Sequence, residues 1–308
     1  MLVVKFCGGL GNQMYQYAMS IALSQMYPNQ EIKADIFHYN LLNEHNGFEL
    51  DQYFNFVFPV ATRKEVRKVY PGFIPGNGIG ILPLKIRETI AFKLQWYYLF
   101  AINRIFKGKK EKVVNEPEFS EKASLLETGD WYISGMWQDL GFFKDYKEQI
   151  AKSMIPKINL SQDDLEVQQL LISGKAIAVH VRGGDFLKLG DRYNLCDKEY
   201  YQTALGNFDK SLPVYVFTDD PQHAKNVIGN ARECVVVSHG VNGSIIDIFM
   251  LSHCKYLVIS NSTFAFWGAF LNKVYDTIVC PEYMRKDGNK NIRSVKEEDW
   301  ISVVNIGP

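Results

Sequence analysis

The sequence predicts an α/β protein built from two doubly wound, Rossmann-like parallel sheets. In the second half of the chain, five short apolar runs rich in β-branched residues alternate with amphipathic stretches of helical length. The first half opens with the same succession of strand, glycine-rich loop and helix. A polar segment over residues 156–162 separates the halves, and 308 residues suffice for two domains. Because strict alternation of strand and helix is typical of a parallel sheet covered on both faces, we expect two such domains, 1–156 and 157–308.

The elements expected in the second half follow one another at short intervals. The strands are expected at residues 176–181, 213–217, 234–237, 256–259 and 277–280. The helices between them are expected at residues 198–207, 221–228, 245–254 and 263–271. In open α/β sheets, ligands bind at the carboxyl ends of the strands, so the residues that follow these strands are the first candidates for a site.

The first half is regular at its two ends and less so between them. Strands are expected at residues 2–6, 31–35 and 131–134, and helices at residues 12–26 and 139–151. Residues from about 40 to 110 show no clear periodicity and carry turn signals such as Pro71-Gly72 and Pro75-Gly76.

Charge and cysteine content argue against several classes of protein. The 34 basic residues balance 34 acidic ones, so a generally basic surface for nucleic acid is not indicated. The five cysteines are far apart and form no C-x-x-C pair, which favours reduced thiols in the cytoplasm over a zinc site or a disulfide framework. No uncharged apolar run reaches the roughly 18–20 residues of a membrane span. The aromatic run 96–100 and the basic run 104–110 indicate either a core helix with a solvated tail or a peripheral contact with the inner face of a membrane.

The first candidate site is the segment from His180 to Asp185. Alternation along a strand places His180 and Arg182 on one side, and Gly183-Gly184 then lets a ligand approach the backbone. An arginine at the carboxyl end of a strand suits a bidentate contact with phosphate. The alternative is an ion pair between Arg182 and Asp185 that braces the loop, and spacing alone leaves both interpretations open.

Two further candidates lie at expected helix starts. Ser244 and Asp247 fit the S-x-x-D capping pattern, and the alternative for Asp247 is a carboxylate that accepts hydrogen bonds from the N–H groups of guanine. Asp220 precedes Pro221 as a ready N-cap, whereas Asp219 has no such role and could face a ligand.

No D-x-D triplet is present in the sequence, so no metal site for a sugar diphosphate is indicated. The charge of a leaving group would then be met by arginine, hydroxyl groups and helix dipoles. The segment Ser260-Asn261-Ser262-Thr263 offers three hydroxyls and an amide at a helix start, more than the N-cap Ser262 alone requires, which favours a phosphate site.

The loop over residues 8–13 is the last candidate. Gly9 and Gly11 partly match the dinucleotide fingerprint, but Met14 stands where a third glycine belongs, and Asp35 would be the acidic partner. Alternatively, Asn12 and Gln13 at the helix start hydrogen-bond a sugar or a phosphate.

Six segments in order along the chain, 8–18, 135–138, 180–186, 215–220, 247–252 and 260–271, resemble the bacterial α-1,2-fucosyltransferases of glycosyltransferase family eleven. The resemblance implies a GT-B-like fold with two domains facing a cleft, of which 1–156 would bind the acceptor and 157–308 the donor. It further implies transfer from GDP-β-L-fucose to the 2-hydroxyl of a terminal galactose, with inversion and with neither metal nor cofactor. The acceptor would be a galactose-terminated oligosaccharide or a lipid-linked glycan.

The resemblance also implies roles for single residues. Arg182 would hold the donor diphosphate, steadied by Asp185 and His180, and Asn12 would lie beside the reacting sugar. Asp247 would pair with guanine. The remaining donor contacts would come from Gly9, Gly11, Gln13, Asp219, Ser262 and Thr263.

One departure stands out, because members of the family usually carry a second arginine where this chain has Gly183. Either Arg192 or Lys188 replaces that cation, or the donor differs. Three alternatives therefore remain beside the fucosyltransferase: a GT-B enzyme for another nucleotide sugar, an NAD-dependent oxidoreductase, and a sugar-binding module.

Overall fold

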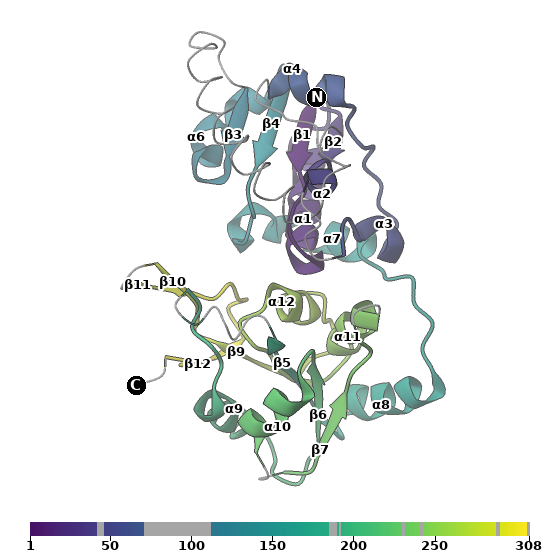
Figure 1. Cartoon of the computed structure of the whole chain (residues 1–308), viewed down its shortest axis with the longest axis vertical. Coiled ribbons are helices and arrows are strands. Elements are labelled where there is room, and N and C mark those ends of the chain that lie inside the picture. The colour runs from purple at the N-terminus through teal and green to yellow at the C-terminus, as the bar shows by residue number, and fades with distance from the viewer. Residues whose placement is uncertain are drawn as a thin grey trace. The chain divides into compact units, whose positions relative to one another are not determined.

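The fold was analysed in a computed structural model that describes residues 1–41, 46–70, 112–184, 190, 192–229, 232–240, 243–287 and 290–306. The chain divides into two compact units, Met1–Ile155 and Pro156–Pro308 (Figure 1). The domain boundary expected from the sequence lies one residue from this division. Each unit is an α/β structure built around its own parallel sheet. Two such units are the architecture of a GT-B-like protein.

The N-terminal unit contains a four-stranded parallel sheet in the order β2-β1-β4-β3. Its strands are β1 Leu2–Lys5, β2 Ile32–Asp35, β3 Val113–Asn115 and β4 Trp131–Ser134. The long helix α1, Leu10–Met26, follows β1 and is buried over most of its length. Because the chain leaves β1 toward β2 and later returns to its other side at β4, the winding direction changes between β1 and β4.

The remaining helices of this unit are short. They are α2 His38–Leu41, α3 Leu50–Tyr53, α4 Arg63–Val69, α6 Phe119–Lys122 and α7 Lys147–Ser153, with 3₁₀ turns η2 Glu116–Glu118, η3 Ala123–Glu127, η4 Leu140–Phe142 and η5 Lys144–Tyr146.

The helix expected at residues 139–151 is wrong in its first half, which forms η4 and η5 before α7 begins. Asp139 accepts a hydrogen bond from the backbone N–H of Gly141 at 2.8 Å and thereby closes a turn. The adjacent Phe142 and Phe143 pack on different aromatic partners, Trp137 and Tyr15. The turn at Asp139 and these ring contacts accompany the two 3₁₀ turns, so local and tertiary contacts override the periodic pattern.

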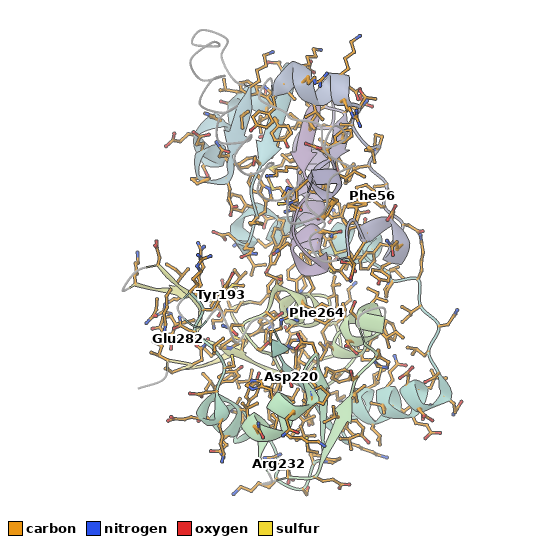
Figure 2. All side chains as sticks on the ribbon, in the orientation of Figure 1. Phe56, Tyr193, Asp220, Arg232, Phe264 and Glu282 are labelled. Carbon is orange, nitrogen blue, oxygen red and sulfur yellow. The ribbon has the colours of Figure 1, made fainter. Side chains whose placement is uncertain are left out.

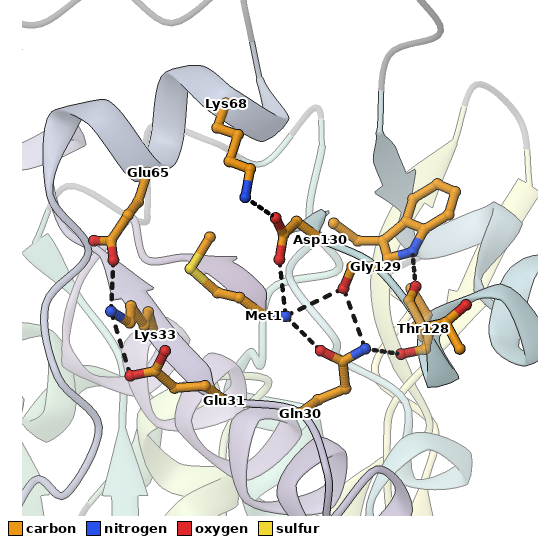
Figure 3. A network of polar contacts seen from close by, with 11 residues as sticks. Met1, Gln30, Glu31, Lys33, Glu65, Lys68, Thr128, Gly129 and Asp130 are labelled. Atoms are coloured by element: carbon orange, nitrogen blue, oxygen red, sulfur yellow. Dashed lines mark hydrogen bonds and ion pairs between the residues drawn. The ribbon is translucent and has the colours of Figure 1, made fainter.

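Polar contacts hold the amino end of the N-terminal sheet (Figure 3). The Met1 nitrogen donates to the carbonyl of Gly129 and to Asp130, both at 3.1 Å. Lys33, on β2, pairs with Glu65 of α4 at 2.6 Å. These contacts lie at the amino ends of β1, β2 and β4. The carboxyl ends of these strands, where ligands bind in open α/β sheets, are formed by other residues.

The C-terminal unit contains a six-stranded parallel sheet in the order β12-β9-β8-β5-β6-β7. Its strands are β5 Ile177–Val181, β6 Val214–Thr218, β7 Cys234–Val237, β8 Tyr256–Val258, β9 Thr277–Pro281 and β12 Ile301–Val303. In chain order this is the 3-2-1-4-5-6 arrangement of dinucleotide-binding sheets, read from the other edge. The winding direction therefore changes between β5 and β8.

Helices cover both faces of this sheet. They are α8 Gln162–Ile172, α9 Lys198–Leu205, α10 Pro221–Ile228, α11 Ser244–Leu251 and α12 Thr263–Phe270. Val179 and Val181 join the hydrophobic core with α9 and α10, whereas His180 faces α12. The alternation predicted for this strand is confirmed.

Three parts of this unit were not expected from the sequence, and the first is the sixth strand of the sheet, β12. Helix α8 begins inside the segment taken as a linker, where Ser161 and Asp164 form a capping box. An antiparallel hairpin, β10 Tyr283–Asp287 and β11 Lys290–Arg293, follows β9.

All five cysteines are free thiols, of which Cys7, Cys196, Cys254 and Cys280 are buried and Cys234 is partly exposed. Among the described residues, no helix combines the length and the apolar composition needed to span a membrane. The aromatic and basic runs at 96–110 lie outside the described residues.

Candidate active site

The candidate site of the C-terminal unit lies where β5 ends, at the point between β5 and β8 where the winding changes. The buried imidazole of His180 places Nδ1 2.8 Å from the hydroxyl oxygen of Ser260, which follows β8. Its ring lies 5.7 Å from that of Phe264. Burial, with the nearby charge of Arg182, lowers the pKa of His180 to about 3. His180 is therefore a neutral brace between the two central strands.

Arg182 lies two residues after His180 and forms an ion pair with Asp219, at the end of β6. The other carboxylate oxygen of Asp219 accepts a hydrogen bond from the backbone N–H of Gly183 at 2.8 Å. The Arg182 side chain is 32% exposed, so solvent and ligands can reach it. Asp185, the alternative partner considered for Arg182, lies outside the described residues. Asp219, expected to contact the donor, is paired with Arg182 in this structure.

The backbone at Gly183 packs against the first turn of α10. A Cβ atom placed on Gly183 would lie 2.4 Å from Cβ of Asp220, much closer than two such atoms approach. Asp220 caps α10 by accepting from the N–H of His223 at 3.0 Å, as predicted, so it cannot easily retreat. In this structure, the close approach of Asp220 therefore leaves no room for a side chain at Gly183. Figure 2 labels Asp220 and Phe264, the residues against Gly183 and His180 respectively.

Lys188 and Arg192 are the two residues suggested as a replacement for the missing cation. Lys188 lies outside the described residues. Arg192 is exposed, and within the described part of the chain its guanidinium makes no hydrogen bond or ion pair.

Three of the four polar residues before and at the start of α12 have separate partners. Ser260 contacts His180, and Asn261 donates to backbone carbonyls of two other segments. The Ser262 hydroxyl caps α12 by accepting from the N–H of Phe264 at 3.3 Å. Thr263 opens the helix at its positive end. Three of the four side chains therefore have structural roles, which is more than the sequence suggested.

The capping role considered for Ser244 is wrong. Helix α11 begins at Ser244 itself, and its N-cap is Gly243, which has no side chain to offer. Asp247 is instead held by His239, whose Nδ1 lies 2.5 Å from the Asp247 carboxylate. The other ring nitrogen of His239 lies 2.8 Å from Asp164, on α8.

The two aspartates raise the pKa of His239 to about 9. The hydrogen bond to Asp247 has the larger effect, and the hydrogen bond to Asp164 adds to it. Burial raises the pKa of Asp247 itself. No sequence pattern singles out His239, because 75 positions separate it from Asp164.

In the N-terminal unit, the glycine loop after β1 positions α1. Gly9 is the N-cap of α1, and Gly11 lies buried in its first turn. Gln13 is fully buried, and its amide donates to the carbonyls of Gly8 at 3.0 Å and Gly47 at 2.8 Å. The Gln13 amide therefore joins segments within the unit, whereas the sequence suggested a contact with the donor. Asn12 is only partly buried, and its carbonyl accepts from the Gln138 amide at 2.8 Å.

The acidic residue that a nicotinamide cofactor would need is engaged elsewhere. Asp35 is buried and accepts from the hydroxyl of Tyr132 at 2.7 Å and from the N–H of Phe37 at 2.9 Å. Met14, in place of the third glycine, is fully buried. These contacts argue against the NAD-dependent oxidoreductase.

The loop after β4 carries Gln138. The sequence pointed to this loop as residues 135–138, but it did not point to Glu116, which supports the loop. One carboxylate oxygen of Glu116 accepts from the N–H groups of Met136 at 2.8 Å and Trp137 at 2.9 Å. Trp137 is fully buried with a φ of 58°, a conformation uncommon for a bulky residue. The carboxylate therefore holds a strained turn that presents Gln138 to Asn12.

The C-terminal unit thus has the sheet order of a nucleotide-binding α/β domain, with an arginine at the carboxyl end of a central strand. Two Rossmann-like units in one chain are typical of GT-B glycosyltransferases. A sequence model of the family described as Glycosyl transferase family 11 matches residues 89–304. The chain belongs to this family and is a glycosyltransferase.

Two Escherichia coli relatives match most of the chain, and a mammalian relative matches about half of it. An alpha-1,2-colitosyltransferase of Escherichia coli is 28% identical over 285 residues, covering 89% of this chain and 88% of the relative. The O-antigen biosynthesis glycosyltransferase WbnK of Escherichia coli is 26% identical, covering 96% and 98% respectively. The galactoside alpha-(1,2)-fucosyltransferase 1 of Rattus norvegicus is 28% identical over 167 residues, covering 49% and 44%.

Proposed function

We propose that the chain transfers L-fucose from GDP-β-L-fucose to the 2-hydroxyl of a terminal galactose, with inversion to an α-1,2 linkage and without a metal. The observation that carries the proposal is the position of Arg182, at the carboxyl end of β5 beside the change in winding. Support comes from the resemblance of the site segments to α-1,2-fucosyltransferases and from the rat galactoside fucosyltransferase among the relatives.

In this proposal, the exposed guanidinium of Arg182 binds the donor diphosphate, and Asp219 sets its orientation. The start of α12 at Thr263 adds N–H groups and the positive end of the helix dipole, an arrangement that favours anions. Charge develops on the diphosphate as the bond to fucose breaks. The same groups therefore contribute more in the transition state than with bound donor, which is how they accelerate transfer.

Guanine recognition is assigned to Asp247. A carboxylate accepts hydrogen bonds and cannot donate them, so it suits the N1–H and 2-amino groups of guanine. Asp247 lies in the first turn of α11, where the helix dipole also favours a negative charge.

The N-terminal unit is assigned to the acceptor. The hydrogen-bonded amides of Asn12 and Gln138 lie where the winding of its sheet changes, and amides suit neutral sugar hydroxyls. WbnK supports a glycan of the O-antigen type as acceptor, assembled in the cytoplasm or at the inner face of the membrane. The base that receives the acceptor proton would be Asp185 or Asp191, both outside the described residues.

A second donor, the GDP-linked form of colitose, is favoured by the colitosyltransferase that is 28% identical over most of both chains. Colitose differs from fucose by the loss of one ring hydroxyl, so the two donors share the nucleotide contacts proposed here.

The deciding experiment offers the purified chain GDP-fucose, GDP-colitose, GDP-mannose and UDP-galactose with β1,3- and β1,4-linked galactosides. Release of nucleotide measures turnover, and NMR of the product assigns the linkage and the anomeric configuration. We expect α-1,2-linked fucose, with turnover unchanged in EDTA. Preferential turnover of GDP-colitose would establish the second candidate, and turnover of UDP-galactose alone would overturn both.

A further inference from the structure

A histidine between two aspartates joins three elements of the C-terminal unit. His239 follows β7, Asp164 lies in the first turn of α8, and Asp247 lies in the first turn of α11. Both ring nitrogens of His239 are engaged, Nε2 with Asp164 at 2.8 Å and Nδ1 with Asp247 at 2.5 Å. A histidine with both nitrogens facing carboxylates donates from both, and its orientation is fixed.

The backbone is built closely around this histidine. A Cβ atom on Gly243, the N-cap of α11, would lie 2.3 Å from Cβ of His239. Only a glycine lets the start of α11 approach His239 so closely. The side-chain contact with Asp247 therefore depends on a close approach of the two segments.

The two carboxylates differ in their remaining hydrogen-bonding capacity. Asp164 uses its second oxygen in the capping box, where it accepts from the N–H of Ser161 at 3.0 Å and from its hydroxyl at 2.8 Å. The second oxygen of Asp247 accepts no hydrogen bond from any residue that the structure describes. Asp164 is thus the anchor, and Asp247 keeps an oxygen available for a ligand.

We propose that His239 is the positioning residue that makes Asp247 a guanine-selective acceptor, with Asp164 fixing the imidazole from behind. This inference rests on the proposed function, because it assigns a determinant of base specificity within the same nucleotide site.

The charges support this role. Asp164 on α8 and Asp247 on α11 are the charged groups that face His239 from the described elements around it. Their proximity raises the pKa of His239 to about 9, so the imidazolium persists through neutral pH. Burial alone favours a protonated, neutral Asp247, and the hydrogen bond from His239 opposes that effect. A charged partner therefore keeps Asp247 an acceptor.

Guanine is the base that such an acceptor selects. It presents two adjacent donors, N1–H and the 2-amino group, whereas hypoxanthine presents only N1–H. Uracil presents one donor between two carbonyl acceptors, and adenine presents a ring nitrogen that repels a carboxylate. A buried acceptor left without its donor accounts for strong discrimination against analogues.

The test compares binding of GDP, IDP and UDP to the full chain by isothermal titration calorimetry. H239N places an amide nitrogen near the position of Nδ1, so it retains a donor toward Asp247 and loses Asp164. H239Q places one near Nε2 and retains the donor toward Asp164 alone. G243A keeps every polar group but displaces His239, and D276N, which changes an exposed pair with Lys255, is the control.

We expect the wild type and D276N to prefer GDP over UDP by at least about tenfold, and H239Q and G243A to lose most of that preference. H239N should lie nearer the wild type. In H239Q, the preference should recover as the pH rises, because burial raises the pKa of Asp247 and the carboxyl group then ionises without its partner. A purely structural role would weaken all three nucleotides equally at every pH.

The outcomes separate the two proposals. A wild type that binds UDP as well as GDP would overturn the proposed guanine donor itself. A wild type that prefers GDP, with H239Q and G243A folded and equally selective, would overturn only the role of His239. Thermal melting of each variant establishes that it is folded before binding is compared.

Discussion

The Nδ1 atom of His180 and the hydroxyl oxygen of Ser260 lie 2.8 Å apart, joining the ends of β5 and β8. These are the neighbouring strands between which the C-terminal sheet changes its winding direction. The contact holds the end of β5, which carries Arg182, against the segment that leads into α12. Geometry at a proposed diphosphate site therefore depends on a buried, uncharged pair.

Replacing Ser260 with alanine should leave the buried His180 nitrogen without its partner. We expect the free energy of unfolding to fall by about 1–3 kcal/mol, measured by urea denaturation. Ser211, whose exposed hydroxyl donates to Asp209, provides a matched serine-to-alanine control. An equal loss in the two variants would show that the His180–Ser260 contact contributes no special stability.

The pH dependence of stability should report His239. Its pKa in the folded chain, about 9, lies above the ordinary value of 6.5. The stabilisation is therefore fully present below about pH 6.5 and is lost as the pH rises through 9. We expect the wild type to lose its advantage over H239Q, about 1–3 kcal/mol, between pH 6 and pH 9.5. A constant difference across this range would contradict a charged His239.

Replacing Arg182 with alanine should lower kcat by about 10²–10³, because the proposed contact strengthens as charge develops on the leaving diphosphate. R182K should fall between, since lysine keeps the charge but loses the planar fork. The exposed Arg293 provides a control, as R293A removes a surface pair with Glu282. Steady-state release of GDP measures the effect, and near-normal turnover in R182A would place the diphosphate elsewhere.

Restoring the arginine common in the family should harm this chain. G183A already forces its Cβ against Asp220, so we expect it to destabilise the fold by about 1–3 kcal/mol. G183R should not tighten donor binding. Because D220G removes the opposing Cβ, the double variant G183A/D220G should lose less stability than the two single losses combined. Additive losses in urea denaturation would show that the two residues do not collide.

Replacing Glu116 with alanine should release the turn at Trp137. Two backbone N–H groups lose their carboxylate, and we expect a loss of about 1–3 kcal/mol in the free energy of unfolding. On the proposed function, KM for the acceptor should rise while KM for the donor stays constant. E118A removes a nearby carboxylate, paired with Lys122, that does not contact the turn at Trp137, and it should have the smaller effect. A rise in the donor KM would contradict the assignment of this loop to the acceptor.

Local patterns predicted the elements more reliably than they predicted capping. The α10 cap at Asp220 was predicted because an aspartate directly before a proline determines its own backbone geometry. The capping motif at Ser244 was misassigned, because α11 begins one residue earlier, with Gly243 as its N-cap in close approach to His239. Sequence spacing carries no information about a contact of that kind.

By itself, the sequence determined the two parallel sheets, the alternation that turns His180 away from Val179 and Val181, and the grouping of Arg182 and Ser262 at strand ends. Each follows from short-range periodicity and from the rule that parallel strands end at one edge. Only the tertiary structure decided the partners of these residues. It joined Arg182 to Asp219, His180 to Ser260, and His239 to both Asp164 and Asp247. Partner choice depends on which segments the sheet order brings together, and strand order is set by the whole chain rather than by any one motif.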